Sequence, residues 1–360
     1  MKVLLTGTHF TTALATIEEF KNYPKVELVY VGRKTTREGD KTLSQESLEL
    51  PKMGVKFIPI IAGRLQRSFT IYTIPSLLKI PIGFIQAFWI LIQEKPDVTL
   101  SFGGYVSVPL VFWSWLLSIP VIIHEQTLVT GLANKISSFF ADKIAVSFPV
   151  DNNFPKEKVI LTGNPLRKEI LEIRLQPSRL PHKLPTILVT GGNQGSHIIN
   201  LAMENCLDKL IKVAKVIHQT GDSKLEDFER LEVRQNESYQ IFKWIPDMGK
   251  VLKNVDLIIG RAGINILIEA AYLGIPVLAI PIPYLYGDEQ NKNANFFEKL
   301  RLVRILPQSK LSGKTLLANI KSCLNDLNHF HQDAKNAKSV IIPDAAKKLA
   351  LETIDLGDEL

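Results

Sequence analysis

The sequence predicts an α/β protein with two doubly wound, Rossmann-like domains that face each other across a cleft. Residues 97–126 and 255–286 carry this prediction. Each reads as a buried strand, a glycine turn, a helix and a second strand that begins with Ile-Pro-Val, which is the βαβ unit of a parallel sheet. The length of 360 residues also favours two domains over one.

The predicted domains are residues 1–163 and 164–343. The stretch from 168 to 185 is charged, contains prolines and lacks a glycine turn, as is typical of a connection between domains. A final helix, at about 344–360, is expected to pack back on the first domain.

The first domain alternates short apolar runs with segments of helical periodicity. Strands are expected at 3–5, 26–31, 55–61, 97–102, 119–123 and 143–146, and helices at 13–22, 70–93, within 106–118 and at 131–140. His9 lies in the polar turn after the first strand, where an isolated histidine is usually structural.

The second domain has a glycine loop after its first strand. Strands are expected at 186–190, 213–217, 239–242, 257–259 and 277–280, with helices that begin at 197 and 264. The loop at 191–196 has the spacing GGxxG instead of GxGxxG, and the next strand is followed by no acidic residue. These differences exclude a dinucleotide-binding fingerprint but leave phosphate binding at the helix N-terminus.

A nucleotide-sugar site is predicted around the turn at 260–263. The free N–H groups at the start of the following helix favour a phosphate, and Glu269, about one and a half turns into that helix, suits the hydroxyls of a ribose. Residues 288–290 and Asn293 add polar groups after the next strand, at the sheet edge where open α/β sheets bind ligands. From these residues alone, a solvated loop beside a core helix explains the pattern equally well.

The charge of the chain favours anionic partners, since its net charge is +7 and its pI is near 9.1. Nucleic acid is not expected among them, because the basic residues are dispersed and form no arginine-rich helix or RNP-type motif. Cys206 and Cys323 make neither a disulfide framework nor a metal site, which suits a reducing compartment. No signal peptide is evident at the start of the sequence.

Residues 64–93 combine arginines with an apolar stretch and have two interpretations. The apolar run at 80–92 is shorter than the roughly 20 residues that a membrane span needs. A helix that is hydrophobic all round would be fully buried. Alternatively, an apolar patch with a basic rim would dock on an anionic bilayer, which the flanking charges slightly favour. The apolar run at 106–123 contains Pro109 and Pro120 and is expected to be a helix followed by a buried strand.

Six motifs point to a known family. They are GGYVS at 103–107, HEQ at 124–126 followed by Gly131 and Asn134, GNPLR at 163–167, GGNQGS at 191–196, HQTG at 218–221 and DEQNKNA at 288–294. In these motifs the chain resembles the MurG-like peptidoglycan N-acetylglucosaminyltransferases, GT-B enzymes of glycosyltransferase family 28. The resemblance implies transfer of N-acetylglucosamine from UDP-GlcNAc, with inversion, to the 4-hydroxyl of a lipid-pyrophosphoryl N-acetylmuramyl peptide. It also implies a peripheral protein at the cytoplasmic face of the cell membrane, a part in cell-wall growth and division, and no metal or other cofactor.

The resemblance also implies roles for individual residues. His9 would be the general base, which suits an imidazole with a pKa near neutrality. Glu269 would hold the ribose, and Trp244 and Ile245 would border the uracil. The implied donor-binding residues are Arg167, Asn193, Gln194, Gly195, Ser196, Trp244, Ile245, Gly263, Ile264, Glu269, Glu289 and Gln290. The implied acceptor-side residues are Thr8, Gly103, Gly104, Tyr105, His124, Glu125, Gln126 and Asn134.

Five residues on the acceptor side depart from the family pattern, and Leu4 and Leu5 in the first glycine loop are two of them. Thr8 stands where a glycine would let the backbone approach a pyrophosphate, Thr12 stands for a proline, and Thr127 for an asparagine. Three alternatives are therefore kept beside the leading hypothesis. They are a UDP-sugar transferase with another lipid acceptor, a UDP-GlcNAc 2-epimerase, and a non-catalytic relative that binds nucleotide sugars.

Overall fold

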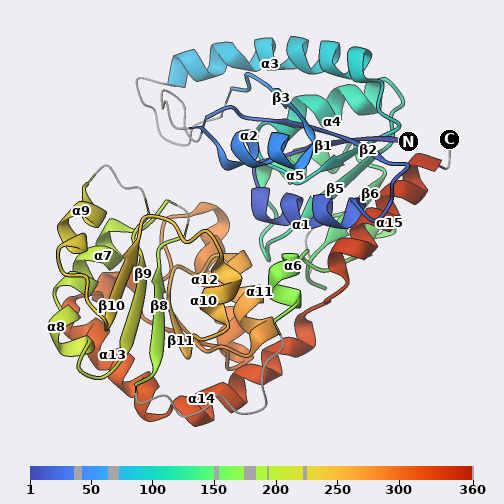
Figure 1. Cartoon of the computed structure of the whole chain (residues 1–360). Helices are drawn as coiled ribbons and strands as arrows, with labels where there is room; N and C mark the ends of the chain where they lie inside the picture. Colours follow the sequence, from blue (N-terminus) through green and yellow to red (C-terminus); the bar gives the residue numbers. More distant parts are fainter. Residues whose placement is uncertain are drawn as a thin grey trace. The chain divides into compact units, whose positions relative to one another are not determined.

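The computed structural model describes residues 1–35, 43–63, 73–149, 154–173, 184–192, 194–221 and 225–358. The chain divides into two compact units (Figure 1). One unit comprises Met1–Lys168 together with Ile342–Leu360, and the other comprises Glu169–Ile341. The domain boundary expected from the sequence, at 163, lies a few residues before this division.

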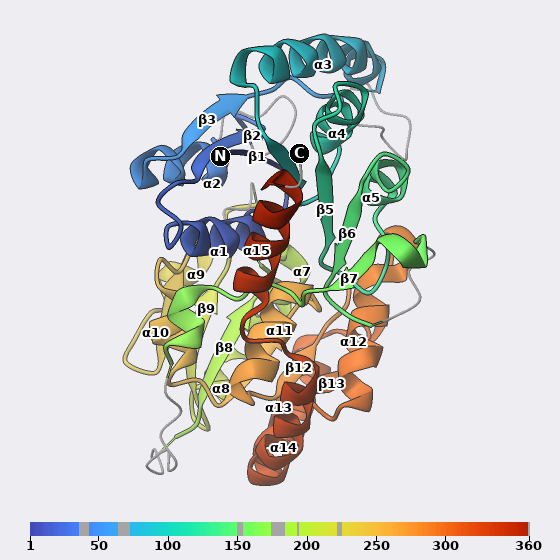
Figure 2. The ribbon, with the colours of Figure 1, turned by 90° about the vertical axis from the view of Figure 1, so that its right-hand side faces the viewer.

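The first unit is built on a seven-stranded parallel sheet in the order β3-β2-β1-β4-β5-β6-β7. The strands are β1 Lys2–Thr6, β2 Glu27–Gly32, β3 Lys56–Pro59, β4 Val98–Ser101, β5 Val121–Glu125, β6 Lys143–Val146 and β7 Val159–Leu161. The helices are α1 Phe10–Phe20, α2 Gln45–Glu49, α3 Thr73–Glu94, α4 Ser107–Leu116, α5 Leu132–Ser137 and α15 Ala345–Asp358. Figure 2 shows α15 lying beside α1 along this unit.

The second unit is built on a six-stranded parallel sheet in the order β10-β9-β8-β11-β12-β13. The strands are β8 Thr186–Thr190, β9 Lys215–Gln219, β10 Tyr239–Phe242, β11 Leu257–Gly260, β12 Val277–Ala279 and β13 Val303–Ile305. The helices are α6 Lys168–Leu171 at the division, α7 His197–Glu204, α8 Leu207–Leu210, α9 Asp227–Glu232, α10 Met248–Leu252, α11 Ile264–Leu273, α12 Glu289–Lys299, α13 Gly313–Asn325 and α14 Leu327–Ala334.

The first six strands of the seven-stranded sheet have the same order as the six-stranded sheet, which confirms the predicted pair of doubly wound folds. In each sheet the chain first adds strands outward on one side of a central strand. It then crosses back and adds the remaining strands on the other side. The direction therefore reverses between β1 and β4 in the first sheet and between β8 and β11 in the second. Every residue of β4, β5, β11 and β12 is buried, as expected for central strands covered by helices on both faces. Ligands of such sheets bind at the carboxyl ends beside these reversal points.

The last helix completes the core of the first unit. Leu349 and Ala350 of α15 are fully buried in the hydrophobic cluster that contains α1 and β4. Lys143 of β6 forms an ion pair of 2.8 Å with Glu352. Residues at opposite ends of the sequence therefore share one core.

Several elements differ from the sequence-based prediction, among them α1, β9 and two edge strands. Helix α1 begins at Phe10, three residues earlier than expected, so His9 becomes its N-cap and residue 12 lies inside the helix. Strand β9 begins and ends two residues later than predicted. The edge strands β7 and β13 were not predicted, because each is only three residues long and β13 carries a charge at Arg304.

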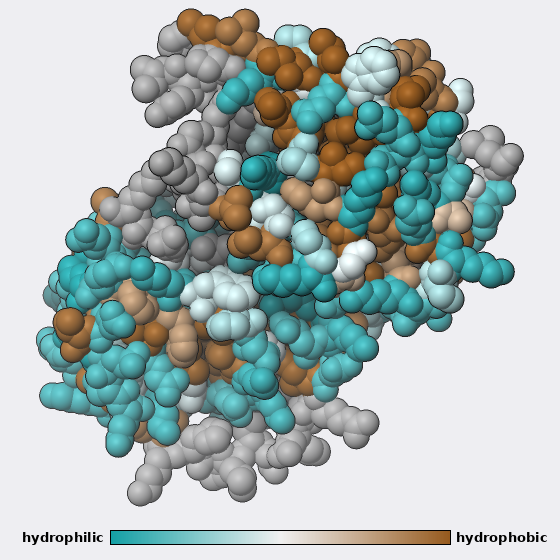
Figure 3. Space-filling view, turned by 45° about the horizontal axis from the view of Figure 1, so that its top comes forward, coloured by the Kyte–Doolittle hydropathy of each residue, from teal (hydrophilic) through white to brown (hydrophobic). Residues whose placement is uncertain are grey.

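Helix α3 is neither fully buried nor fully exposed, so the interpretation of a buried helix is wrong. Its inner face packs on the first unit through Ala87, Ile90 and Leu91. The outer face is apolar and exposed, and Figure 3 shows it as brown side chains along the top of the view. Its exposed residues are Ile74, Leu77, Leu78, Ile82, Ile85, Trp89 and Ile92. Leu77–Glu94 is long and apolar enough to cross a membrane by length and composition, but its packed inner face instead makes it amphipathic.

Candidate active site

The first cluster of candidate residues lies at the carboxyl edge of β1, β4 and β5, three neighbouring strands. The loop after β1 contacts the loop after β4, because the backbone N–H of Thr8 donates to the carbonyl oxygen of Gly103 at 3.0 Å. The Thr8 side chain lies where a Cβ on Gly104 would be. The threonine that departs from the family pattern is thus accommodated by the glycine of the neighbouring loop.

His9 lies at the N-terminus of α1 and is half-buried. Its Nδ1 atom is 2.6 Å from Nε2 of Gln126, the residue that follows β5. Burial, and to a smaller extent the positive charge of Arg33, lowers the pKa of His9 to about 4. This pKa lies below the near-neutral value expected from the sequence, because the ring is buried. The imidazole is therefore neutral at pH 7 and has one ring nitrogen able to accept a proton.

Thr12 links His9 to a further strand end. Its Oγ1 atom is 2.8 Å from Gln126 Oε1 and 3.3 Å from Asn164 Oδ1. Asn164 in turn donates from Nδ2 to the backbone carbonyl of Gln126 at 3.3 Å. All three side chains are buried. The sequence predicted Gln126 on the acceptor side, whereas Thr12 was noted only as a departure from the family pattern and Asn164 only as part of the GNPLR motif.

The other predicted acceptor-side residues after β5 hold the loop in place. Glu125 accepts hydrogen bonds from the backbone N–H groups of Thr127 and Gly131, and from Asn134 Nδ2 at 3.0 Å. His124 is buried, and its Nε2 lies 3.1 Å from the carbonyl oxygen of Gly163. Burial lowers the pKa of His124 to about 4. Glu125, His124 and Asn134 therefore have defined partners within the protein, whereas Tyr105 after β4 is half-buried.

The second cluster lies at the carboxyl edge of β8 and β11. Ser196 is the N-cap residue of α7, yet its hydroxyl makes no capping hydrogen bond, and it has no partner among the described residues although it is buried. Gln194 before it is exposed, and Gly195 closes a turn by donating its N–H to Gly192 at 3.0 Å. Asn193, also predicted to bind the donor, lies outside the described residues.

Helix α11 presents a second uncapped N-terminus next to the first. Its N-cap is Gly263, with φ of −70°, and no side chain within the described part of the chain caps it. A Cβ built on Gly263 would meet no atom within 4 Å. Neither backbone conformation nor packing thus requires glycine here. The space in front of Gly263 and Ile264 is open to a ligand that approaches the N–H groups.

The loops around this edge are held by buried polar side chains. Gln290, at the start of α12, accepts from the N–H of Ile282 at 3.0 Å, and Asn293 donates to the carbonyl oxygen of Ala262 at 3.2 Å. Glu269 of α11 is 4% exposed, so its carboxylate is almost wholly enclosed. Glu289 is half-buried.

Two residues that hold these loops were missed by the sequence analysis. Arg261 is buried and donates to the carbonyl oxygen of Ile280 at 2.9 Å, which joins the loops after β11 and β12. Gln219, at the end of β9, accepts from the N–H of Ile245 at 3.0 Å and donates to the carbonyl oxygen of Gly192 at 3.3 Å. A polar residue that ends a buried strand is the signal that could have identified Gln219.

Two predicted donor residues have different surroundings. Trp244 is 44% exposed. Arg167 is half-buried and belongs to the first unit, at the end of the GNPLR motif.

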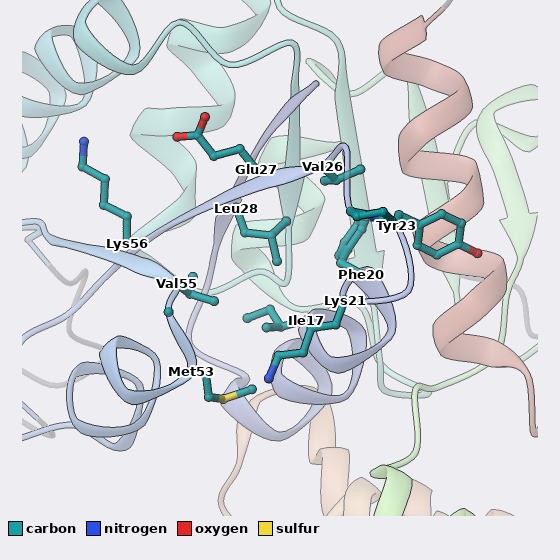
Figure 4. A pocket seen from close by; sticks show the side chains of 12 residues that line it. Ile17, Phe20, Lys21, Tyr23, Val26, Glu27, Leu28, Met53, Val55 and Lys56 are labelled. Carbon is teal, nitrogen blue, oxygen red and sulfur yellow. The ribbon is translucent and has the colours of Figure 1, made fainter.

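The first unit also has a cavity of about 310 Å³ away from these clusters (Figure 4). It is lined by the last turn of α1 and by the first residues of β2 and β3, including Phe20, Leu28 and Val55. It therefore lies at the amino edge of the sheet, opposite His9.

Two family models match the chain. The glycosyltransferase family 28 N-terminal domain matches residues 5–146, and the family's C-terminal domain matches residues 186–349. The chain belongs to glycosyltransferase family 28.

Individual relatives agree with this assignment. The UDP-N-acetylglucosamine–N-acetylmuramyl-(pentapeptide) pyrophosphoryl-undecaprenol N-acetylglucosamine transferase of Listeria monocytogenes is 34% identical over 96% of this chain and 95% of its own. The crystal structure of Acinetobacter baumannii MurG is 26% identical, has a TM-score of 0.74, and is matched over 98% of this chain and 99% of its own. A UDP-GlcNAc 2-epimerase from Neisseria meningitidis, 16% identical with a TM-score of 0.63 over 98% of this chain and 99% of its own, shares the fold. The family 28 chain therefore has the GT-B fold and is a glycosyltransferase.

Proposed function

We propose that this family 28 enzyme transfers N-acetylglucosamine from UDP-GlcNAc to the 4-hydroxyl of undecaprenyl-pyrophosphoryl-N-acetylmuramyl pentapeptide. The reaction converts lipid I to lipid II in peptidoglycan synthesis. The observation that carries this proposal is the similarity to a relative named for that transfer, over 96% of the chain.

The donor binds at the second sheet in this proposal. Helices α7 and α11 follow the neighbouring strands β8 and β11. The uncapped N-termini of both helices favour the diphosphate of UDP. Glu269 hydrogen-bonds the ribose hydroxyls, and Trp244 covers the uracil. Glu289 and Gln290, at the first turn of α12, bind the sugar hydroxyls. The N–H group of Ser196, the N-cap residue of α7, adds a phosphate contact.

The transfer is a single displacement with His9 as the general base. The acceptor hydroxyl oxygen forms a bond to C1 of N-acetylglucosamine while the bond from C1 to the diphosphate oxygen breaks. The electron pair of that bond leaves with UDP, whose charge the helix N-termini stabilise, and the hydroxyl proton passes to His9. Because attack comes from the face opposite UDP, the configuration at C1 is inverted. This scheme uses no metal ion.

The acceptor reaches the first unit from a membrane surface, to which α3 docks as a peripheral element. The exposed face of α3 continues through tilted ring pairs, with centroids 4.9 Å apart for Phe88 and Trp113 and 5.1 Å apart for Trp115 and Phe140. Trp115 and Phe139 extend the exposed apolar surface. Arg64 and Arg67, which would form a basic rim, lie outside the described residues. The free buried cysteines suit the cytoplasmic face, whose anionic lipids attract a basic protein.

Radiolabelled UDP-GlcNAc and lipid I test the proposed function. We expect label to pass to the lipid, and His9→Ala to reduce kcat by roughly 10²- to 10⁴-fold, as for loss of a general base. His329→Ala is the control, since that side chain is 67% exposed on α14. Conversion of UDP-GlcNAc without acceptor would indicate the epimerase instead, and transfer to other lipids but not lipid I would reject the proposed acceptor.

A further inference from the structure

The buried side chains beside His9 form a chain of hydrogen bonds whose direction can be worked out from one end. At that end, Asn164 faces the backbone carbonyl of Gln126, which can only accept a hydrogen bond. Asn164 must therefore direct its NH₂ group there. Its Oδ1 atom then faces Thr12 Oγ1, at 3.3 Å.

The next link is the hydroxyl of Thr12, which has one proton to donate. It lies 3.3 Å from Asn164 Oδ1 and 2.8 Å from the side-chain amide of Gln126. Because Asn164 Oδ1 can only accept, a hydroxyl that donates to it must in turn accept from Gln126. The Gln126 amide then directs its NH₂ group to Thr12 and its oxygen to His9.

The Gln126 amide can take this orientation without changing its shape. A half-turn about its last bond exchanges oxygen and nitrogen at nearly the same positions. If the amide nitrogen faces His9, Thr12 donates its proton to Gln126 Oε1. Asn164 Oδ1 then receives no hydrogen bond from Thr12. With oxygen towards His9, one proton arrangement satisfies every contact in the chain, and buried polar groups favour such an arrangement.

We propose that Thr12 is a positioning residue that fixes the tautomer of His9 through the Gln126 amide. The structure places Gln126 Nε2 2.6 Å from His9 Nδ1. After the half-turn the amide oxygen takes that position, so His9 carries its proton on Nδ1 and donates it to Gln126. The lone pair is then on Nε2. The same oxygen stabilises the imidazolium after Nε2 has accepted a proton. This inference rests on the proposed function only in naming Nε2 as the atom that takes the acceptor's proton.

The tautomer can be measured by ¹⁵N NMR of the full chain labelled at histidine, because protonated and unprotonated ring nitrogens resonate at well-separated frequencies. The signals of His9 are identified by their loss in His9→Gln. We expect Nδ1 to carry the proton in the wild type and in Thr12→Ser. In Thr12→Val, which keeps the shape but lacks the hydroxyl, the proton should move to Nε2.

A second variant and a rescue make the test independent of one substitution. Asn164→Ala removes the acceptor for Thr12 and should also move the proton to Nε2. Gln126→Glu in the Thr12→Val background should restore the proton to Nδ1, because a carboxylate only accepts. Thermal unfolding of each variant shows that it is folded.

Kinetics give the second readout. Thr12→Val should lower kcat with lipid I about tenfold or more while the KM for UDP-GlcNAc stays unchanged, and Thr12→Ser should retain kcat. A wild type protonated at Nε2 would overturn the inference. So would Thr12→Val and Asn164→Ala variants that keep the wild-type tautomer. If the tautomers change as expected but the wild type transfers no sugar, the hydrogen-bond chain stands and the proposed function fails.

Discussion

Gln219 Oε1 accepts a hydrogen bond from the backbone N–H of Ile245 at 3.0 Å, which ties the loop after β10 to the end of β9. Replacing Gln219 by Leu leaves that buried N–H without a partner, which costs about 1–3 kcal/mol. We expect a lower free energy of unfolding in urea and weaker UDP-GlcNAc binding. Gln240→Leu is the matched control, because Gln240 is exposed on β10. Equal effects of the two substitutions would contradict this role.

Gly263→Ser separates ligand binding from folding. Serine is a good N-cap residue, and a Cβ at this position meets no atom of the protein within 4 Å. The free energy of unfolding should therefore stay the same or rise. The added side chain occupies the space in front of α11, so UDP should bind at least about tenfold more weakly, which is 1.4 kcal/mol. Calorimetry with UDP that gives unchanged affinity would show that no phosphate sits there.

Glu269→Ala tests the ribose contact. Loss of the carboxylate should weaken UDP-GlcNAc binding by roughly 1–3 kcal/mol if it bonds the ribose hydroxyls. Because Glu269 is only 4% exposed, the unfolding free energy should be measured on the same sample. Glu298→Ala, an exposed residue of α12, is the control. Unaltered affinity in the Glu269 variant would remove this residue from the donor site.

The exposed face of α3 should bind vesicles of anionic phosphatidylglycerol. Leu78, Ile85 and Trp89 are 65%, 61% and 56% exposed. Replacing all three by serine removes apolar area that the bilayer would bury, so sedimentation with vesicles should be lost while the fold is kept. Val233→Ser, at a residue 85% exposed in the second unit, should have no effect. Vesicle binding that survives the triple substitution would assign docking to another surface.

His218 makes stability depend on pH. Burial lowers its pKa to about 4, although the negative charge of Asp227 acts in the opposite direction. Its ring lies between Tyr239 of β10 and Asn200 of α7. The unfolded chain binds a proton below about pH 6.5, whereas the folded protein does not until about pH 4, so stability falls as the pH drops through this interval.

Urea unfolding at pH 7.5 and pH 5 measures this contribution. His218 alone should account for about 2 kcal/mol of the difference between the two pH values. His218→Gln should reduce the difference by that amount. The pKa values of His9 and His124 are also lowered, so these residues act in the same direction. They should account for the pH-dependent difference that remains in the variant. A difference that His218→Gln leaves unchanged would mean that this histidine is already protonated in the folded protein at pH 5.

The sequence was sufficient for most of the strands and for both glycine loops of the second unit. Strands such as β6, β8 and β10 have the predicted bounds because an apolar run between turn residues is a local signal. The half-exposed packing of α3 was one of two open interpretations, since hydropathy alone does not say which face contacts the protein.

Contacts between distant residues could not be predicted in the same way. Thr12 and Asn164 are 152 positions apart and meet only because β1, β5 and β7 belong to one sheet. Glu125 was predicted from its motif, but the motif does not reveal that the carboxylate is occupied by four donors, three from Thr127 and Gly131 and one from Asn134 of α5. Local patterns therefore located the site, whereas the direction of its hydrogen bonds required the fold.

The return of α15 to the first sheet has a consequence for synthesis on the ribosome. The amino-terminal sheet emerges first, but Leu349, Ala350 and Leu356 of its core are translated after the whole second unit. Until then, the apolar groove that they fill stays uncovered beside α1. The nascent first unit must wait until α15 has been translated, and a truncated product that stops before α15 would expose that groove to chaperones and proteases.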